Sequence, residues 1–238
     1  GDPASVQTRL RSAAANEETF YSLLATEALA ITPARQQETF RPDRQAWRAL
    51  NDLPNIRAAA AMAELNEDKY ADDLIRHQAR IGRAEDHRQL LAMASALNLP
   101  ETQLYLAHNT PGGRPLASSA RYPQPNWQPA GGWKVDPSLV YAHTLQESRF
   151  QRAAVSPAGA QGLMQVRPGT ARDIARWQSI GVNVNDLKSP SVNMELGQSY
   201  LQHLSRDPST SGHLPKIIAA YNAGPAPIAR WQSEIRDQ

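Results

Sequence analysis

One glutamate stands in a segment that otherwise has the composition of a buried helix. Glu147 lies in the sequence HTLQESRF, with no second carboxylate, no metal-ligand spacing and no cysteine nearby. At about 100° per residue, Val140, Thr144 and Glu147 share one side of a helix, with His143 and Phe150 beside them. Burial there disfavours the charged carboxylate and raises its pKa. A carboxyl group that stays protonated near neutral pH can act as a general acid in glycosidic bond cleavage.

A purely structural interpretation of the same glutamate is open. Arg149, Arg152 and Arg167 are close in sequence, and an ion pair with one of them would keep Glu147 charged. In that case the carboxylate would stabilise the fold and take no part in chemistry.

The residues after the glutamate favour a site. The sequence SPAGAQGLMQ places Ser156, Gly159 and Gly162 in a turn of small residues, which lets backbone approach a ligand closely. Gln165 offers a planar amide for sugar hydroxyls or an N-acetyl group, and Met164 offers a soft apolar surface. This pattern predicts a saccharide site beside the glutamate.

Other kinds of chemistry find little support in the sequence. The formal net charge is +2, which is no nucleic-acid footprint, and no apolar run reaches the length of about 20 residues that spans a bilayer. His143 and Glu147 are one helical turn apart but lack a third metal ligand nearby. The acidic residues of AELNEDKYADD are interpreted as a solvated helix face. We therefore expect no metal, no cofactor, no nucleic acid and no transmembrane segment.

The elements around these residues are predicted to be helical. From Ser5 to about Asn109 the chain favours short antiparallel helices, typical of an α-solenoid, at 17–30, 43–51, 56–67, 68–82 and 86–98. Residues 109–133 hold five prolines and four glycines and are expected to form an extended connector at a domain boundary.

A second helical region follows the connector. Asp136 with Pro137 predicts a capped start for the Glu147 helix, and Ser189 with Pro190 opens a later helix. Thr170 and Asp173 resemble a capping box that begins the helix in between.

Three blocks of this region carry a family resemblance. QESRFQRAAVSPAGAQGLMQVRPGTA, DLKSPSVNMELGQSYLQHL and IIAAYNAGP, within about 133–232, closely resemble the catalytic domain of the soluble lytic murein transglycosylases. The resemblance implies an all-α protein, in which an α-solenoid-type helical N-terminal region precedes a lysozyme-like, mainly helical catalytic domain. The implied division is 1–39 for the end of a superhelical domain, 40–118 for a helical linker domain and 119–238 for the catalytic domain. The family continues through a further segment, so the C-terminus would be truncated.

The resemblance also implies an activity. Members of this family cleave the β-1,4 bond between N-acetylmuramic acid and N-acetylglucosamine in peptidoglycan and leave a 1,6-anhydro-muramoyl end. Glu147 matches the single catalytic acid, which then acts as base. Because the N-acetyl group of the substrate supplies the internal nucleophile, a second carboxylate is not needed. Peptidoglycan glycan strands would be the partner, in the periplasm of a Gram-negative bacterium.

Six further positions match the family's substrate-binding residues. They are Ser156, Gly162, Met164, Gln165, Tyr221 and Asn222. The resemblance places Ser156 near the N-acetyl group, Gln165 in the glycan groove with Gly162 and Met164 in the same wall, and the Tyr221 hydroxyl beside the acid. Asn222 would mainly tie down a helix end.

One departure from the family pattern leaves alternatives open. Arg167 stands where the family usually has an apolar methionine, and an ion pair with Glu147 would lower the pKa of that acid. Besides a transglycosylase, the chain could be a goose-type-lysozyme-like hydrolase, in which water replaces the C6 hydroxyl, or a non-catalytic peptidoglycan-binding or scaffolding protein.

Overall fold

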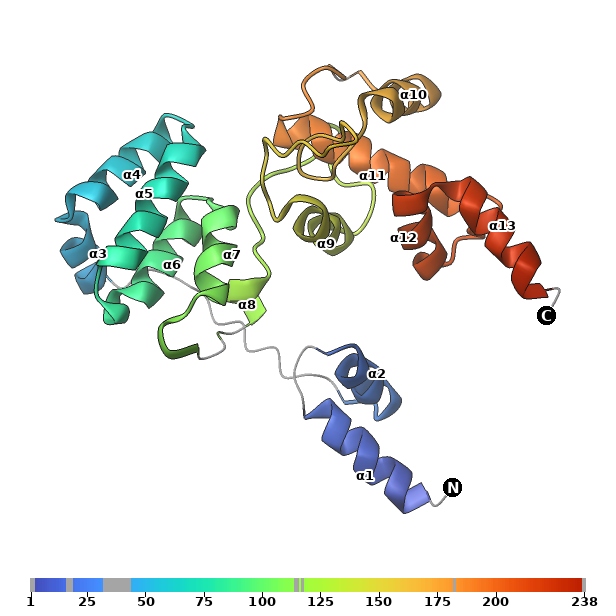
Figure 1. Cartoon of the computed structure of the whole chain (residues 1–238), viewed down its shortest axis with the longest axis horizontal. Coiled ribbons are helices and arrows are strands. Elements are labelled where there is room, and N and C mark those ends of the chain that lie inside the picture. The colour runs from blue at the N-terminus through green and yellow to red at the C-terminus, as the bar shows by residue number, and fades with distance from the viewer. Residues whose placement is uncertain are drawn as a thin grey trace. The chain divides into compact units, whose positions relative to one another are not determined.

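The computed structural model describes residues 3–15, 19–31, 44–113, 116, 118–181 and 183–236 (Figure 1). In these residues the chain forms thirteen α-helices and two short 3-10 helices, and it has no β-strand. Two isolated bridges, Val155 with Gln161 and Gln161 with Val166, are the extended pairings there. The prediction of an all-α protein is confirmed. The expected boundary between 39 and 40 lies outside the described residues.

The chain divides into two compact units, Gly1–Glu38 and Thr39–Gln238. The first holds α1 (Pro3–Ala14) and α2 (Phe20–Ala28), which pack against each other. Thr19 begins α2 by accepting a hydrogen bond from the backbone amide of Ser22. Whether this region belongs to a solenoid stays a prediction.

The second unit begins with a group of helices around their own apolar core. They are α3 (Arg44–Asn51), α4 (Pro54–Glu64), α5 (Asp68–Ile81), η1 (Ala84–Asp86), α6 (His87–Ala96), α7 (Pro100–His108), η2 (Pro111–Gly113) and α8 (Ser118–Arg121). The expectation of a fully extended connector after Asn109 is wrong at α8. Ala120 is buried, and the side chain of Gln103 donates to its carbonyl oxygen, so packing on α7 outweighs the proline- and glycine-rich surroundings.

The remaining helices surround a second core. They are α9 (Pro137–Ser148), α10 (Pro168–Gln178), α11 (Pro190–Arg206), α12 (Leu214–Ala223) and α13 (Pro225–Arg236). Figure 1 shows α11 between α9 and α10, and its middle turns are buried. A helix enclosed in this way gives its neighbours a fixed frame.

Two of the three expected helix starts are confirmed. The Asp136 side chain accepts from the amide of Ser138 with Pro137 as the first helical residue, and Pro190 opens α11 after Ser189. The capping box at Thr170 is wrong. The helix begins earlier, at Pro168, because the ring of proline already has the φ value of a first turn.

A buried acid in α11 fastens the segment before α9. Glu195 is 1% exposed and accepts from the amide of Gly131 and from the Lys134 ammonium group. Gln198, one turn on, donates to the carbonyl oxygen of Gly132. Because a buried charge is stable only when paired, these bonds determine where α9 begins relative to α11.

Candidate active site

Glu147 lies in the last turn of α9 and is half-buried. Its neighbours Val140 and Thr144 on the same helix are fully buried, as the helical pattern predicts. Burial raises the pKa of the Glu147 carboxyl above its usual value, and the charge of His143 acts in the opposite direction. Burial therefore favours the protonated form of the side chain, and the His143 charge opposes it.

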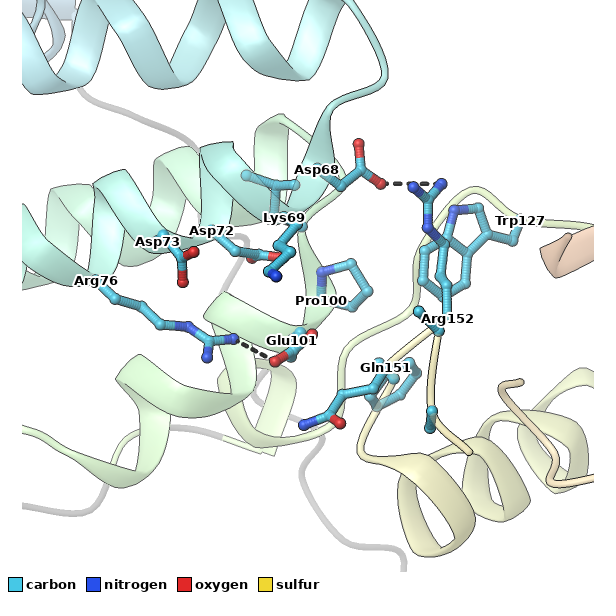
Figure 2. A pocket seen from close by; sticks show the side chains of 14 residues that line it. Asp68, Lys69, Asp72, Asp73, Arg76, Pro100, Glu101, Trp127, Gln151 and Arg152 are labelled. Atoms are coloured by element: carbon cyan, nitrogen blue, oxygen red, sulfur yellow. Dashed lines mark ion pairs between the residues drawn. The ribbon is translucent and has the colours of Figure 1, made fainter. Parts of the chain in front are cut away.

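Nearby arginines do not neutralise this acid in the part of the chain that the structure describes. Arg149 ends α9 in a left-handed conformation and is exposed. Arg152 forms an ion pair of 3.1 Å with Asp68 of α5 (Figure 2). Arg167 is exposed at the start of α10, and no ion pair joins it to Glu147 among the described residues.

The small-residue turn after α9 is a compact, hydrogen-bonded loop. Ser156 donates its amide to the carbonyl oxygen of Ala160, and its hydroxyl oxygen accepts from the amide of the same residue. Gly159 adopts a positive φ of 78° at the tip. The hydroxyl hydrogen of half-buried Ser156 remains available to a ligand.

Gly162 is required by close backbone approach rather than by a ligand. Its φ is 76°, and a Cβ there would lie 2.1 Å from the carbonyl oxygen of Leu187. The side chain of Asn193 in α11 holds the loop at this point, accepting from the amide of Met164 at 2.7 Å and donating to the carbonyl oxygens of Gln161 and Leu187. The sequence analysis missed Asn193, although an asparagine in a buried helix is itself a signal of such anchoring.

Met164 and Gln165 contribute to the loop in different ways. The Met164 side chain is fully buried against Gly197, so it packs in the core and does not line an open groove. Gln165 has a positive φ of 48° and is half-buried. Its side-chain amide donates to the carbonyl oxygen of Gly162 at 2.9 Å, which leaves the amide oxygen facing away from that bond.

Tyr221 brings α12 to the site. Its hydroxyl donates to the carbonyl oxygen of Met164 at 2.9 Å, and its ring meets His143 edge-on at 4.8 Å between centroids. Burial first, and the charge of Glu147 second, raise the pKa of Tyr221, so it stays a neutral phenol. Asn222, the next residue, is exposed near the end of α12.

A pocket of about 370 Å³, lined by both charged and apolar residues, lies between α5, α7 and the segment that follows α9 (Figure 2). The interpretation of the α5 acids as a solvated face is wrong for Asp72, which is 9% exposed. One carboxylate oxygen of Asp72 has no hydrogen-bond partner in the described chain. Burial raises the pKa of Asp72 to about 6, and the side chain of Thr102 and the charge of Arg76 counteract this. The helical period could not predict the burial of Asp72, because the residues that cover its side chain come from other segments of the chain.

The described residues contain no cluster of three or more histidine, aspartate or glutamate side chains able to hold a metal ion. In the same residues, every helix is too short or too polar to cross a membrane.

Comparison with known proteins supplies relatives for this arrangement. Residues 126–238 match the family model of the transglycosylase SLT domain. The soluble lytic murein transglycosylase of Escherichia coli K12 is 35% identical over 102 residues, which are 42% of this chain and 16% of that protein. The endo-type membrane-bound lytic murein transglycosylase A of Klebsiella pneumoniae (strain ATCC 700721) is 33% identical over 124 residues, 46% of this chain and 61% of the relative.

A solved structure shares the fold over nearly the whole chain. The lytic transglycosylase Slt of Pseudomonas aeruginosa superimposes with a TM-score of 0.71 at 24% identity, covering 94% of this chain and 37% of that one. It was solved as an inactive mutant in which glutamine replaces a glutamate. This likeness establishes the lysozyme-like helical fold.

Proposed function

We propose that the chain is a peptidoglycan lytic transglycosylase, because its residues 126–238 match the family model of the transglycosylase SLT domain. It cleaves the β-1,4 bond between N-acetylmuramic acid and N-acetylglucosamine and leaves a 1,6-anhydro-muramoyl end. The chain spans 16% of the length of its soluble Escherichia coli relative, so the activity of the whole protein is part of this proposal.

The observation that carries the proposal is the state of Glu147. Burial favours its protonated form, and no cation other than His143 acts on it in the described chain. A two-carboxylate glycosidase needs a second acid within roughly 10 Å. In the described part of the chain, His143 and Tyr221 interact electrostatically with Glu147, and neither is a carboxylate.

In the first step Glu147 is a general acid. Its carboxyl proton goes to the glycosidic oxygen, the bond from C1 to that oxygen breaks, and the N-acetylglucosamine end leaves with a hydroxyl group. The muramoyl N-acetyl oxygen closes on C1, which takes the part of the missing second carboxylate.

In the second step the same side chain is a general base. The Glu147 carboxylate takes the proton of the C6 hydroxyl while that oxygen attacks C1 and the N-acetyl oxygen leaves. The proton given up in the first step is thereby recovered, no water is consumed, and the muramoyl end becomes a 1,6-anhydro ring.

The loop and α12 supply substrate contacts in this proposal. Ser156 donates its free hydroxyl hydrogen to the N-acetyl group, and the amide oxygen of Gln165 accepts from a sugar hydroxyl. Gly162 and Met164 form the backbone of this wall, and Tyr221 holds it in place through the Met164 carbonyl oxygen. Asn222 follows Tyr221 in α12 and is exposed, so in this proposal its side chain contributes a further substrate contact.

The test is a comparison of wild type with Glu147→Gln on purified murein, with the released fragments identified by mass spectrometry. Wild type should release 1,6-anhydro-muropeptides, and the variant should lose about 100- to 10,000-fold in rate, the usual contribution of a general acid. Glu64→Gln, at an exposed position in α4, is the matched control and should behave as wild type.

Each other result of this comparison points to a different function. Reducing ends without anhydro rings would identify a goose-type-lysozyme-like hydrolase. Equal solubilisation by wild type and Glu147→Gln would leave a non-catalytic murein-binding protein.

We propose that the chain acts in the periplasm of a Gram-negative bacterium; the names of its relatives as murein transglycosylases support this proposal. The described helices themselves offer no membrane span. Fractionation of cells of the source bacterium should recover the protein with periplasmic markers; recovery with cytoplasmic markers would contradict this proposal.

A further inference from the structure

His143 is a buried histidine with one ring nitrogen lacking a partner. Its Nδ1 lies 2.8 Å from the carbonyl oxygen of Leu139, one turn earlier in α9. A carbonyl oxygen only accepts, so Nδ1 carries the hydrogen and the neutral ring has its lone pair on Nε2. That Nε2 atom is buried and has no hydrogen-bond partner in the described chain. A buried, unsatisfied acceptor in a native fold calls for an explanation.

Few of the groups around His143 can donate a hydrogen bond to its Nε2 atom. On the same helix, Glu147 follows after four residues and therefore lies on the same face. From α12, the Tyr221 ring contacts the imidazole, but its hydroxyl hydrogen is already donated to Met164. From α11, the ring of Tyr200 contacts the ring of Tyr221, at 5.4 Å between centroids, and among the described residues the ring that contacts His143 is that of Tyr221. Protonated Glu147 is thus the titratable neighbour that still has a hydrogen to offer.

We propose that His143 is the positioning residue of the acid: its buried Nε2 accepts a hydrogen bond from protonated Glu147 and holds that carboxyl group ready for the glycosidic oxygen. This inference rests on the proposed transglycosylase function and assigns its acid a partner. The imidazole neither gains nor loses a proton in the cycle, because Glu147 passes its proton to the leaving oxygen and recovers one from the C6 hydroxyl.

The same geometry assists the second step. Once Glu147 is a carboxylate, the Nε2 lone pair faces a second acceptor, and neutral His143 has no hydrogen with which to stabilise the negative charge. This makes the carboxylate a stronger base toward the C6 hydroxyl. A protonated His143 would do the reverse, because its charge favours the carboxylate form of Glu147 and so removes the acid. A substitution that removes the imidazole should therefore raise the pKa of Glu147 and move the Glu147 limb of the pH-rate profile to higher pH.

Two substitutions of His143 distinguish the role of its Nδ1 atom from that of its Nε2 atom. His143→Asn places an amide nitrogen near Nδ1 and keeps the bond to Leu139, whereas His143→Gln places an amide oxygen near Nε2 and keeps an acceptor for Glu147. Both remove the charge that lowers the pKa of Glu147, so both should move the Glu147 limb of the pH profile of kcat/KM to higher pH. In addition, kcat of the asparagine variant should fall on the order of tenfold, while the glutamine variant stays within about threefold of wild type.

A matched control is His87 in α6, which is equally buried but has its Nε2 bonded to the carbonyl oxygen of Leu106. His87→Asn should lower stability and leave the shape of the pH profile as in wild type. If His143→Asn and His143→Gln also merely scale the whole profile, His143 is a packing residue and the proposal is overturned.

A measurement independent of turnover completes the test. Long-range proton–nitrogen spectra of the full chain should show His143 with its hydrogen on Nδ1, and its Nε2 resonance should move toward that of an unpaired ring nitrogen in Glu147→Leu. An unchanged Nε2 resonance would falsify the hydrogen bond, even if the enzyme is a transglycosylase. Conversely, the Nε2 resonance could change in a protein that releases no anhydro-muropeptides. That result would refute the proposed transglycosylase activity but would support the hydrogen bond between Glu147 and His143.

Discussion

The hydroxyl of Tyr221 donates its one hydrogen to the carbonyl oxygen of Met164, over 2.9 Å. It therefore has nothing left to donate to Glu147, whose charge nevertheless acts on it. Toward the acid, the phenol oxygen can only accept. Tyr221 can therefore accept a hydrogen bond from protonated Glu147, but it cannot stabilise the Glu147 carboxylate by donating one.

This arrangement predicts how Glu147 affects stability as the pH changes. Its pKa is raised in the folded chain, so the folded protein binds the proton more tightly than the unfolded one. The stabilisation that comes from this tighter proton binding is fully present below the pKa of the unfolded chain. It decreases as the pH rises above that value and is lost once the pH exceeds the pKa of the folded chain.

Glu147→Gln should consequently be more stable than wild type at neutral pH, by about 0.5 kcal/mol since solvent screens this half-exposed group. The difference should disappear near pH 4, as measured by urea unfolding at both pH values. A variant less stable than wild type at neutral pH would mean that Glu147 is held as a stabilised carboxylate.

The loop glycines predict a clear contrast in stability. Gly162→Ala forces a Cβ into the Leu187 carbonyl oxygen at a positive φ and should cost about 3 kcal/mol or more in free energy of unfolding. Gly159→Ala meets the same positive φ in open space and should cost about 1 kcal/mol. Chemical denaturation of both variants tests this, and equal losses would show that strain alone, without the close approach, determines the need for glycine.

Asp72 predicts a pH-dependent instability in the pocket beside α5. Its folded pKa of about 6 lies above the usual 3.8, so the folded state loses stability as pH rises from about 4 to 6. Asp72→Asn should be more stable at pH 8, by up to about 3 kcal/mol, and similar to wild type at pH 4.

Its neighbour Asp73 lines the same pocket but is exposed, which makes Asp73→Asn the matched control with a change below about 0.5 kcal/mol. Thermal unfolding across this pH range distinguishes the two aspartates. Stabilisation of both to the same extent would argue for general charge repulsion rather than burial of Asp72.

Sequence periodicity was sufficient for the helical class of the chain and for the placement of Glu147 on a helix, but not for every helix, since α8 was missed. The side of α9 that carries Val140, Thr144 and Glu147 follows from 3.6 residues per turn, and the Asp136 cap follows from local hydrogen bonding. These are properties of neighbouring residues, and so they can be read along the chain. The predicted helix start at Thr170 is wrong because Pro168, a second local signal for a helix start, begins the helix two residues earlier.

Contacts between distant segments could not be predicted in that way. That Asn193 holds Met164, that Glu195 holds Gly131, and that Asp68 takes Arg152 are facts of tertiary packing. The last of these removes an arginine that the sequence alone offered to Glu147 as an ion-pair partner.

The sequence by itself determined an all-helical chain, the position of Glu147 on its helix and the family blocks around it, because these depend on composition, period and local order. Only the tertiary structure decided that Glu147 is partly desolvated without an arginine partner, that Met164 is core and Tyr221 its anchor, and that His143 has an unsatisfied nitrogen. The physical reason is that burial and pairing are set by residues far away along the chain, which no local pattern encodes.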